Sequence, residues 1–225
     1  MPYCTRCGLK LPEDEEARFC PNCGTPILKT LEHVRRGKEK ETAPRGIPRK
    51  NRFLSFLGIL LLTIAVTFAG ALSKVDGSEA QVMVEDFKEI EKMLQIAGIQ
   101  LIFGNNMMYC LAMFIPFLGP LNGFYVLYST GRVLAALSYV LEADPTFLFL
   151  NMLIYPHAWL EYVSYSLAIS ESMWLSFHVL KFRLKGIRAE MMNAAKLISI
   201  CAVLLLAGAF IEMALIKLAL PSIPT

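Results

Sequence analysis

Apolar runs of about twenty residues recur along this chain, and they constrain its fold more than any other feature. An α-helix rises 1.5 Å per residue, so a run of this length crosses the ~30 Å hydrocarbon core of a bilayer. The runs lie near 53–72, 99–118, 122–141, 157–180 and 197–219, and 55% of the 225 residues are hydrophobic, more than in a soluble domain. The sequence therefore predicts an all-α membrane bundle of about five transmembrane helices over residues 53–220.

The charges of the connecting segments predict how this bundle is oriented. Residues 31–52 hold eight Lys or Arg and three Glu, and "KFRLKGIRAEMMNAAK" (181–196) holds five basic residues and one acid. Segment 73–98 holds six acids and three Lys. Basic segments stay in the cytoplasm. We therefore expect a multi-pass cell-membrane protein with a cytoplasmic N-terminus, an external C-terminus, and a basic linker over 29–52 that lies near lipid head groups.

The shorter segments between the runs carry their own predictions. Segment 73–98 has a roughly helical period of apolar residues and predicts an amphipathic helix at the outer surface. "GPLNG" (119–123) predicts a tight turn between two spans, and "EADP" predicts a short outer turn. Segment 147–155 is too short to span, and it reads as an interfacial or re-entrant piece or as an extension bent at Pro156.

The first 28 residues predict a zinc ribbon. Cys4-x2-Cys7 and Cys20-x2-Cys23 form two pairs separated by twelve residues, each followed by a glycine that permits a tight metal knuckle. Two disulfides are the alternative reading, which a reducing cytoplasm disfavours. Four protein ligands close the coordination sphere, so we expect structural Zn²⁺ that also supplies the folding energy of this small head.

The residues between the two cysteine pairs indicate what kind of partner the head binds. Four consecutive acids, Glu13, Asp14, Glu15 and Glu16, would repel phosphate groups. The head is therefore expected to dock a protein and not nucleic acid.

Polar residues form a stripe along 157–180, where charge in lipid is costly. At about 100° per residue, one face about 100° wide holds His157, Glu161, Ser164, Glu171 and His178. The opposite side holds Trp159, Val163, Leu167 and Trp174, and is expected to face lipid. The stripe must then face protein or water.

Other runs offer polar partners for this stripe. They are Asn105, Asn106, Asn122, Arg132 and Glu212. Arg132 needs an acid, and Glu161, Glu171 and Glu212 are the candidates. Two explanations stay open: the polar residues hold the helices together, or they line a path for protons or a solute. No catalytic role is expected, because "HAWLE" is not the "HExxH" zinc motif and no nucleophile or phosphate-loop motif occurs.

Two blocks resemble the stage II sporulation protein M family. They are "LIFGNNMMYCLAMFIPFLGPLNGFYVLYSTG" and "NMLIYPHAWLEYVSYSLAIS". The resemblance covers about residues 55–219 and carries over Asn105, Asn106, Asn122, Gly123, Pro156, His157 and Glu161, with Ala158 where Gly is expected. The fused ribbon looks like an archaeal arrangement. The resemblance implies a polytopic component of a membrane complex. The family's action with cell-wall hydrolases is not carried over, since no hydrolase motif is present.

Two functions follow as hypotheses. The first is a scaffold or subunit of a membrane complex, with a zinc-ribbon docking module and protein partners at the ribbon and the bundle. The second is a small transporter or permease-like subunit that uses the intramembrane His, Glu, Arg and Asn residues. The sequence indicates neither a solute nor an oligomeric state.

Overall fold

The computed structural model describes residues 3–4, 6–10, 19–25, 49–182 and 187–219. The chain divides into two compact units, Met1–Gly46 and Ile47–Thr225. The predicted ribbon and linker boundaries at 28 and 52 stay predictions. The acidic residues of the ribbon spacer, most of the basic linker and the C-terminal "PSIPT" lie outside the described residues.

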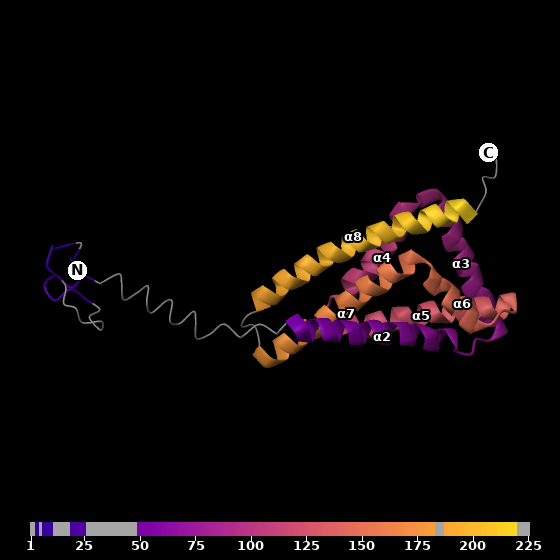
Figure 1. Ribbon diagram of the computed structural model, residues 1–225, viewed down its shortest axis with the longest axis horizontal. Coiled ribbons are helices and arrows are strands. Elements are labelled where there is room, and N and C mark those ends of the chain that lie inside the picture. The colour runs from indigo at the N-terminus through magenta and orange to yellow at the C-terminus, as the bar shows by residue number, and fades with distance from the viewer. Residues whose placement is uncertain (1–2, 5, 11–18, 26–48, 183–186, 220–225) are drawn as a thin grey trace. The chain divides into compact units, whose positions relative to one another are not determined.

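The second unit is built from helices, which confirms the prediction of an all-α bundle (Figure 1). In chain order they are α2 (Arg49–Ala71), α3 (Gly77–Ala97), α4 (Ile99–Met113), α5 (Leu118–Leu141), α6 (Pro145–Ile154), α7 (Pro156–Phe182) and α8 (Ile187–Ala219). We call the end where α2 begins the Arg52 end and the opposite end, which α3 crosses, the α3 end.

Among the described residues, three helices are long and apolar enough to cross a membrane. They are Lys50–Ala71, Leu118–Leu141 and Glu190–Leu218. The other two predicted spans differ from this pattern: α4 has only 15 residues, while α7 has 27 but carries the polar stripe. Both helices nevertheless pack against the apolar helices, α4 against α5 and α8 and α7 against α2, α5 and α8.

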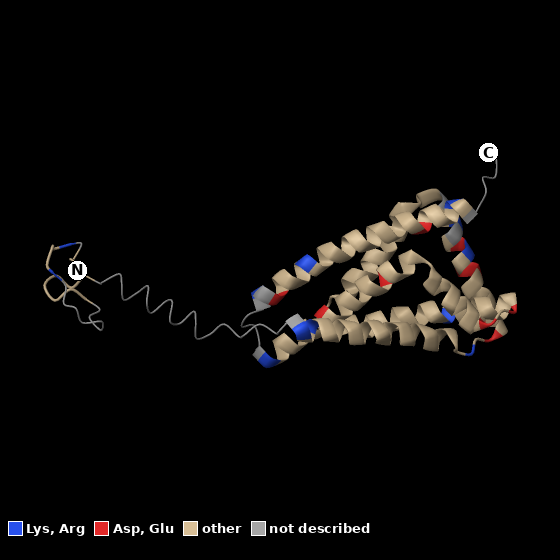
Figure 2. Cartoon of the chain, in the orientation of Figure 1, with Lys and Arg blue, Asp and Glu red and all other residues tan. Residues whose placement is uncertain are grey.

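Charge is distributed as a membrane requires. Figure 2 shows Lys, Arg, Asp and Glu concentrated at the two ends of the bundle, with few charged positions between them. Large apolar side chains are exposed along the helices, as at Leu61 on α2, Tyr125 on α5 and Val203 on α8. These side chains form the lipid-facing surface of a membrane protein.

Helix α7 is the centre of the bundle, in contact with α2, α4, α5, α6 and α8. Its small polar residues Ser164, Ser166 and Ser172 are completely buried. Because neighbours surround it, α7 does not present one whole side to lipid: Trp159 is exposed, but Leu167 packs on the core and Trp174 is half-buried. The predicted lipid-facing side of this helix is therefore only partly exposed.

Helices α2 and α5 cross in backbone contact. A Cβ at Gly131 would lie 2.1 Å from the carbonyl oxygen of Thr67, and one at Gly70 would lie 2.3 Å from that of Tyr128. No side chain fits at such distances. The two glycines therefore set the separation of the first and third predicted spans.

The predicted tight turn at "GPLNG" is wrong, because α5 already begins at Leu118. The chain turns earlier: α4 ends at Met113, and Phe117 has a φ of 65°. Pro116 cannot donate a backbone hydrogen bond, whereas Pro120 is tolerated in the first turn of α5. Serines of α7 hold the turn, as Ser172 Oγ donates to Ile115 O at 2.7 Å and Phe117 N donates to Ser176 Oγ at 2.8 Å.

Of segment 147–155, residues 147–154 belong to a separate ten-residue helix, α6, and the last residue lies in a break before α7. The "EADP" turn is confirmed: Glu142 is left-handed, and Asp144 caps α6 by accepting from Phe147 N at 2.9 Å. The break lies at Tyr155, before Pro156. Trp159 Nε1 donates to Leu153 O at 2.8 Å and thereby fixes the two helices across the break.

The predicted outer helix is present as α3, which crosses the ends of the other helices (Figure 1). Its buried Ala80 and Val84 pack against Ala136 of α5. Met83 and Leu94 are half-buried, and five further apolar side chains are exposed: Val82, Phe87, Ile90, Met93 and Ile96. The helix is thus amphipathic, with an apolar face that the described residues do not cover.

Candidate functional sites: a four-cysteine centre and interhelix polar contacts

The four cysteines of the first unit converge on one point. Their sulfur atoms all lie within 4.8 Å of one another, and the pairs Cys4–Cys23 and Cys7–Cys20 are 3.6 Å apart. The two knuckles repeat one geometry: Gly8 N donates to Cys4 O and Gly24 N to Cys20 O, both at 2.9 Å, and both glycines have a positive φ. Tyr3 and Lys10 pair in an antiparallel bridge beside the first knuckle.

This geometry fits a tetrahedral metal ion. A tetrahedron with metal–sulfur bonds of about 2.3 Å has sulfur–sulfur edges of about 3.8 Å. The observed separations are close to that edge and far from the ~2.05 Å of a disulfide. The Thr25 hydroxyl, 3.1 Å from Cys23 Sγ, lowers the pKa of Cys23 to about 6, and the backbone of Arg6 lowers the pKa of Cys4. Cys4 and Cys23 are thereby shifted toward the thiolate form that binds metal, whereas, despite a hydrogen bond to the Leu9 backbone, burial and the three neighbouring thiols raise the pKa of Cys7 to about 11.

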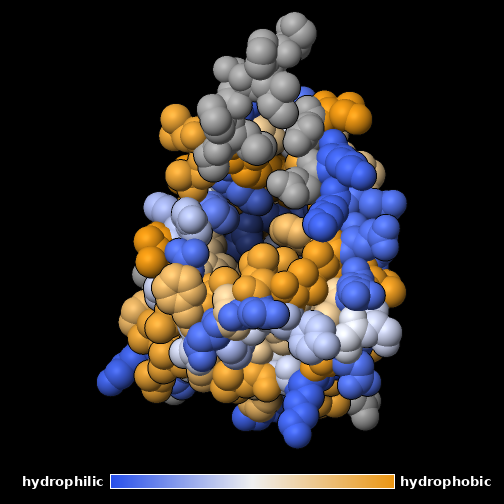
Figure 3. All heavy atoms as spheres, turned by 90° about the vertical axis from the view of Figure 1, so that its right-hand side faces the viewer, coloured by the Kyte–Doolittle hydropathy of each residue, from blue (hydrophilic) through white to orange (hydrophobic). Residues whose placement is uncertain are grey.

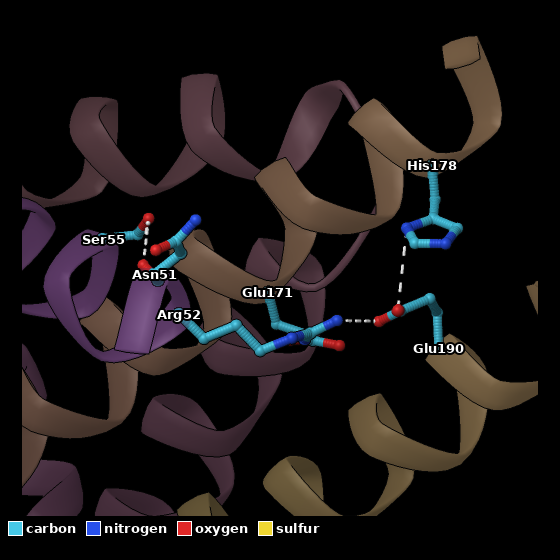
Figure 4. Close-up of polar contacts among 6 residues, drawn as sticks. All are labelled: Asn51, Arg52, Ser55, Glu171, His178 and Glu190. Atoms are coloured by element: carbon cyan, nitrogen blue, oxygen red, sulfur yellow. Dashed lines mark hydrogen bonds and ion pairs between the residues drawn. The ribbon is translucent and has the colours of Figure 1, made fainter. Parts of the chain in front are cut away.

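In the second unit, one arginine joins three helices at the Arg52 end (Figure 4). Arg52 of α2 donates to Glu171 of α7 at 2.7 Å and also pairs with Glu190 of α8. The second oxygen of Glu190 lies 3.6 Å from His178 Nδ1. Glu171, His178 and Glu190 are all buried. This group, which we call the Arg52 cluster, holds α2, α7 and α8 together.

A second polar contact lies nearer the α3 end. Asn106 of α4 donates to Glu161 Oε1 of α7 at 2.7 Å. Glu212 of α8 lies close enough for its charge to interact with that of Glu161. Within the described residues, neither of these two acids forms an ion pair.

Arg132 pairs with none of the three acids predicted for it. Its guanidinium pairs with Glu79 of α3. The reason is the reach of the side chain: Arg132 lies in the second half of α5, against which α3 packs, so its long stem carries the charge toward the aqueous end of the bundle. A partner on the crossing helix is thus closer than one on α7.

The remaining predicted residues are dispersed. Asn105 is exposed, while Asn122 and His157 are half-buried. His157 stacks on Tyr155, with ring centroids 5.7 Å apart. Asn122 Nδ2 and His157 Nδ1 are buried without a hydrogen-bond partner among the described residues. The structure therefore divides the predicted intramembrane residues between several contacts.

Comparison with known protein families assigns both units. Residues 53–215 match the family described as stage II sporulation protein M, and residues 3–27 match a zinc-ribbon domain. The first match covers well over half of the chain. The chain belongs to the stage II sporulation protein M family. No curated protein and no solved structure matches it.

In this stage II sporulation protein M family member, the two resembling sequence blocks meet in space. Asn106 comes from the first block and Glu161 from the second, and their side chains bond directly. Gly123 of the first block lies against Ile169 of α7, where a Cβ would come within 2.5 Å of Ile169 Cδ1. Pro156 begins α7. The family pattern therefore marks the contact of α4 and α5 with α7.

Three charged residues that structure this family member escaped the sequence analysis. The sequence alone places Arg52 in the basic linker, Glu190 in a basic cytoplasmic segment, and Glu79 in the predicted outer amphipathic helix. The available signal was that Glu190 is the single acid of its segment and that Arg52 directly precedes an apolar run. Charged residues at the ends of spans can thus hold helices together, as charged residues within the spans do.

Proposed function

We propose that this protein is a multi-pass subunit that scaffolds a membrane complex, with its ribbon as the docking module for a cytoplasmic protein. One observation carries the proposal: contacts between polar or charged side chains connect six helices of the bundle. Arg52 connects α2, α7 and α8, Asn106 and Glu161 connect α4 and α7, and the pair of Arg132 and Glu79 connects α5 and α3. Polar side chains used in this way fix the register of a bundle. The proposed role is non-catalytic.

The surface of the ribbon supports docking. Tyr3 and Phe19 occupy equivalent positions, each directly before the first cysteine of a knuckle, and both are 61% exposed. Leu9 is exposed as well. A head this small gains nothing from exposed aromatic residues unless they contact something, and aromatic residues are enriched at protein interfaces. In this proposal the metal is Zn²⁺, which four protein ligands hold in a structural role.

The proposed orientation places the Arg52 end of the bundle on the cytoplasmic side of the membrane. The described basic residues at that end are Lys50, Arg52, Lys181, Arg188 and Lys196. The described acids at and around α3 and the α5–α6 turn are Asp76, Glu79, Glu85, Asp86, Glu89, Glu142 and Asp144. In the full sequence, segments 31–52 and 181–196 hold eight and five Lys or Arg, whereas segment 73–98 holds three, and this excess of basic residues supports a cytoplasmic Arg52 end. Labelling of an introduced Asp76→Cys by an impermeant maleimide from outside tests it, and protection of that cysteine would reverse the orientation.

The test of docking is affinity purification of the full chain in mild detergent from its host. The Tyr3→Ser, Phe19→Ser double variant removes the exposed aromatic residues but keeps all four cysteines. We expect it to keep its metal and lose a protein that copurifies with the unaltered chain. Lys10→Ser is the matched ribbon control. Identical copurifying proteins in all three forms would contradict the docking role.

A second candidate, a proton or solute transporter, is favoured by one observation. Figure 3 looks onto the α3 end and shows a hollow with hydrophilic atoms at its floor. Glu161 and Glu212, two acids within the predicted spans that form no ion pair with a described residue, are the groups such a path would use. Glu161→Gln decides between the candidates, because it keeps the bond to Asn106 but cannot carry charge. A scaffold stays assembled and active with this change, whereas proton-coupled uptake into vesicles stops.

A further inference from the structure

A cleft opens between α2, α7 and α8 at the Arg52 end, and neither proposed function uses it. Its volume is about 500 Å³, within the usual range for small-ligand sites. It is lined by Arg52, Phe53, Phe56, Leu167, Ser170, Glu171, Trp174, Asn193, Lys196, Leu197 and Ile200.

The lining changes from polar to apolar along all three helices. On α2, Arg52 precedes Phe56 toward the middle of the bundle. On α7, which runs the opposite way, Trp174 and Glu171 lie nearer the Arg52 end than Leu167. On α8, Asn193 and Lys196 lie nearer that end than Ile200. The cleft thus has a polar part at the end of the bundle and an apolar part deeper in, which is the polarity pattern of a lipid.

Several polar side-chain atoms of the cleft have no hydrogen-bond or ion-pair partner among the described residues. Lys196 is exposed and forms no ion pair with any described residue. Trp174 Nε1, a donor, and Glu171 Oε1, an acceptor, are buried without a hydrogen-bond partner among the described residues, although Glu171 is only 3% exposed. Buried polar atoms without partners are unfavourable, and each needs an explanation.

The two cationic side chains of the cleft, Arg52 and Lys196, differ in whether they are free to bind a ligand. Both Arg52 nitrogens that face the acids are bound, as Figure 4 shows, and the guanidinium lies 5.9 Å from the Trp174 ring. Among the described residues that line the cleft, Lys196 is therefore the cation left for a ligand. A phosphate suits Lys196 and the Trp174 N–H, and a hydroxyl on the same head group suits the free oxygen of Glu171.

We propose that this cleft binds a membrane phospholipid whose anionic head group carries hydroxyls. The phosphate contacts Lys196 and Trp174, a head-group hydroxyl donates to Glu171, and an acyl chain lies along Phe56, Leu167 and Ile200. The site is independent of the ribbon, and it is a binding site for a single lipid molecule in contrast to the general lipid-facing surface.

The experiment is a titration of the full-length protein in dodecyl maltoside, read by native mass spectrometry. The probe is dihexanoylphosphatidylglycerol below its micelle concentration. Two further arms separate the parts of the ligand: inorganic phosphate lacks the chains, and dihexanoylglycerol lacks the phosphate. We expect a saturable adduct of one lipid per protein in the first arm and none of comparable affinity in the other two.

Three variants assign the adduct to the cleft. Lys196→Gln removes the charge at an exposed position, and we expect affinity to fall about tenfold, since a charge-assisted hydrogen bond contributes that much. Ile200→Trp fills the apolar part and abolishes binding. Lys217→Gln, at an exposed position near the other end of α8, is the matched control and binds normally. Circular dichroism confirms that each variant is folded.

Three outcomes would overturn the proposal. Equal affinity of Lys196→Gln and the unaltered chain would mean that the phosphate lies elsewhere. Binding of dihexanoylglycerol as tight as that of the phospholipid would mean a purely apolar groove. Binding of inorganic phosphate as tight as that of the phospholipid would mean an anion site and no lipid site.

Discussion

The ribbon and the bundle of this protein are stabilised in opposite ways. Among the described residues of the ribbon only Cys4 and Cys20 are buried, and its aromatic residues face outward. The bundle has a continuous core around α7, with Met113, Ile169 and Leu205 fully buried. A four-cysteine centre with the geometry of a metal site organises the first unit, while packing and interhelix ion pairs organise the second. A substitution that unfolds one unit should therefore leave the other folded. Each of the following changes tests this independence.

The largest effect is expected from Cys20→Ala. Structural zinc contributes roughly 10–16 kcal/mol of apparent binding free energy in small zinc domains, and the ribbon has almost no core to replace it. We expect zinc content, measured by plasma mass spectrometry, to fall from about one per chain to near zero. The melting temperature of the bundle, followed by helical circular dichroism, should not change. A parallel loss of bundle stability would contradict the independence of the two units.

The next effect is expected from Arg52→Ala. It leaves the buried carboxylates of Glu171 and Glu190 without their cation, which costs about 3–5 kcal/mol when one partner of a buried pair is removed. Unfolding in increasing dodecyl sulfate, followed by circular dichroism, measures the loss. Lys50→Ala, an exposed neighbour on α2, is the control and should change little. Normal zinc content in both variants would show that the ribbon is intact and that the loss of stability arises in the bundle.

A smaller loss is expected from Gly131→Ala. The added methyl would meet the backbone of α2 at 2.1 Å, so that two helices must separate. Overpacking of this kind costs about 1–3 kcal/mol. Gly58→Ala on α2 is the matched control, because no atom lies within 4 Å of the added carbon. The same dodecyl sulfate titration applies, and equal midpoints for the two variants would mean that the α2–α5 crossing is not tight.

The smallest effect is expected from Glu79→Ala. The pair of Glu79 and Arg132 is partly exposed, with 42% and 25% of the side chains accessible. Exposed ion pairs contribute roughly 0–1 kcal/mol. A loss as large as that of Arg52→Ala, in the same titration, would show that the α3 end is as tightly organised as the Arg52 end.

Sequence reasoning reached the parts of the structure that depend on short-range spacing. The four cysteine positions follow from two local turns, and the helices follow from the length of apolar runs. The start of α5 was missed, because Gly119 and Gly123 look like turn residues when read alone. In the structure they serve close packing against Met113 and Ile169, which only the tertiary arrangement reveals.

Charge pairing between helices was the hardest property to predict. The helical period correctly placed Glu161 and Glu171 on α7, but it contains no information about which neighbouring helix faces them. Glu171 pairs with Arg52, which is 119 positions away in the sequence, and Glu161 bonds with Asn106. Such pairs depend on which helices lie side by side in the bundle. No local pattern in a single sequence encodes that arrangement.

The two thiols of the bundle, Cys110 and Cys201, have no exposed surface, and both contact the carbonyl of Ser164. A buried thiol of this kind reacts slowly with aqueous reagents, and the ribbon thiols, of which Cys7 is exposed, would be protected as well once they hold a metal ion. With the ribbon metal in place, labelling of the natural cysteines by thiol reagents should therefore be slow. A spin label or fluorophore attached at one introduced surface cysteine would report on that position alone, without removal of any natural cysteine.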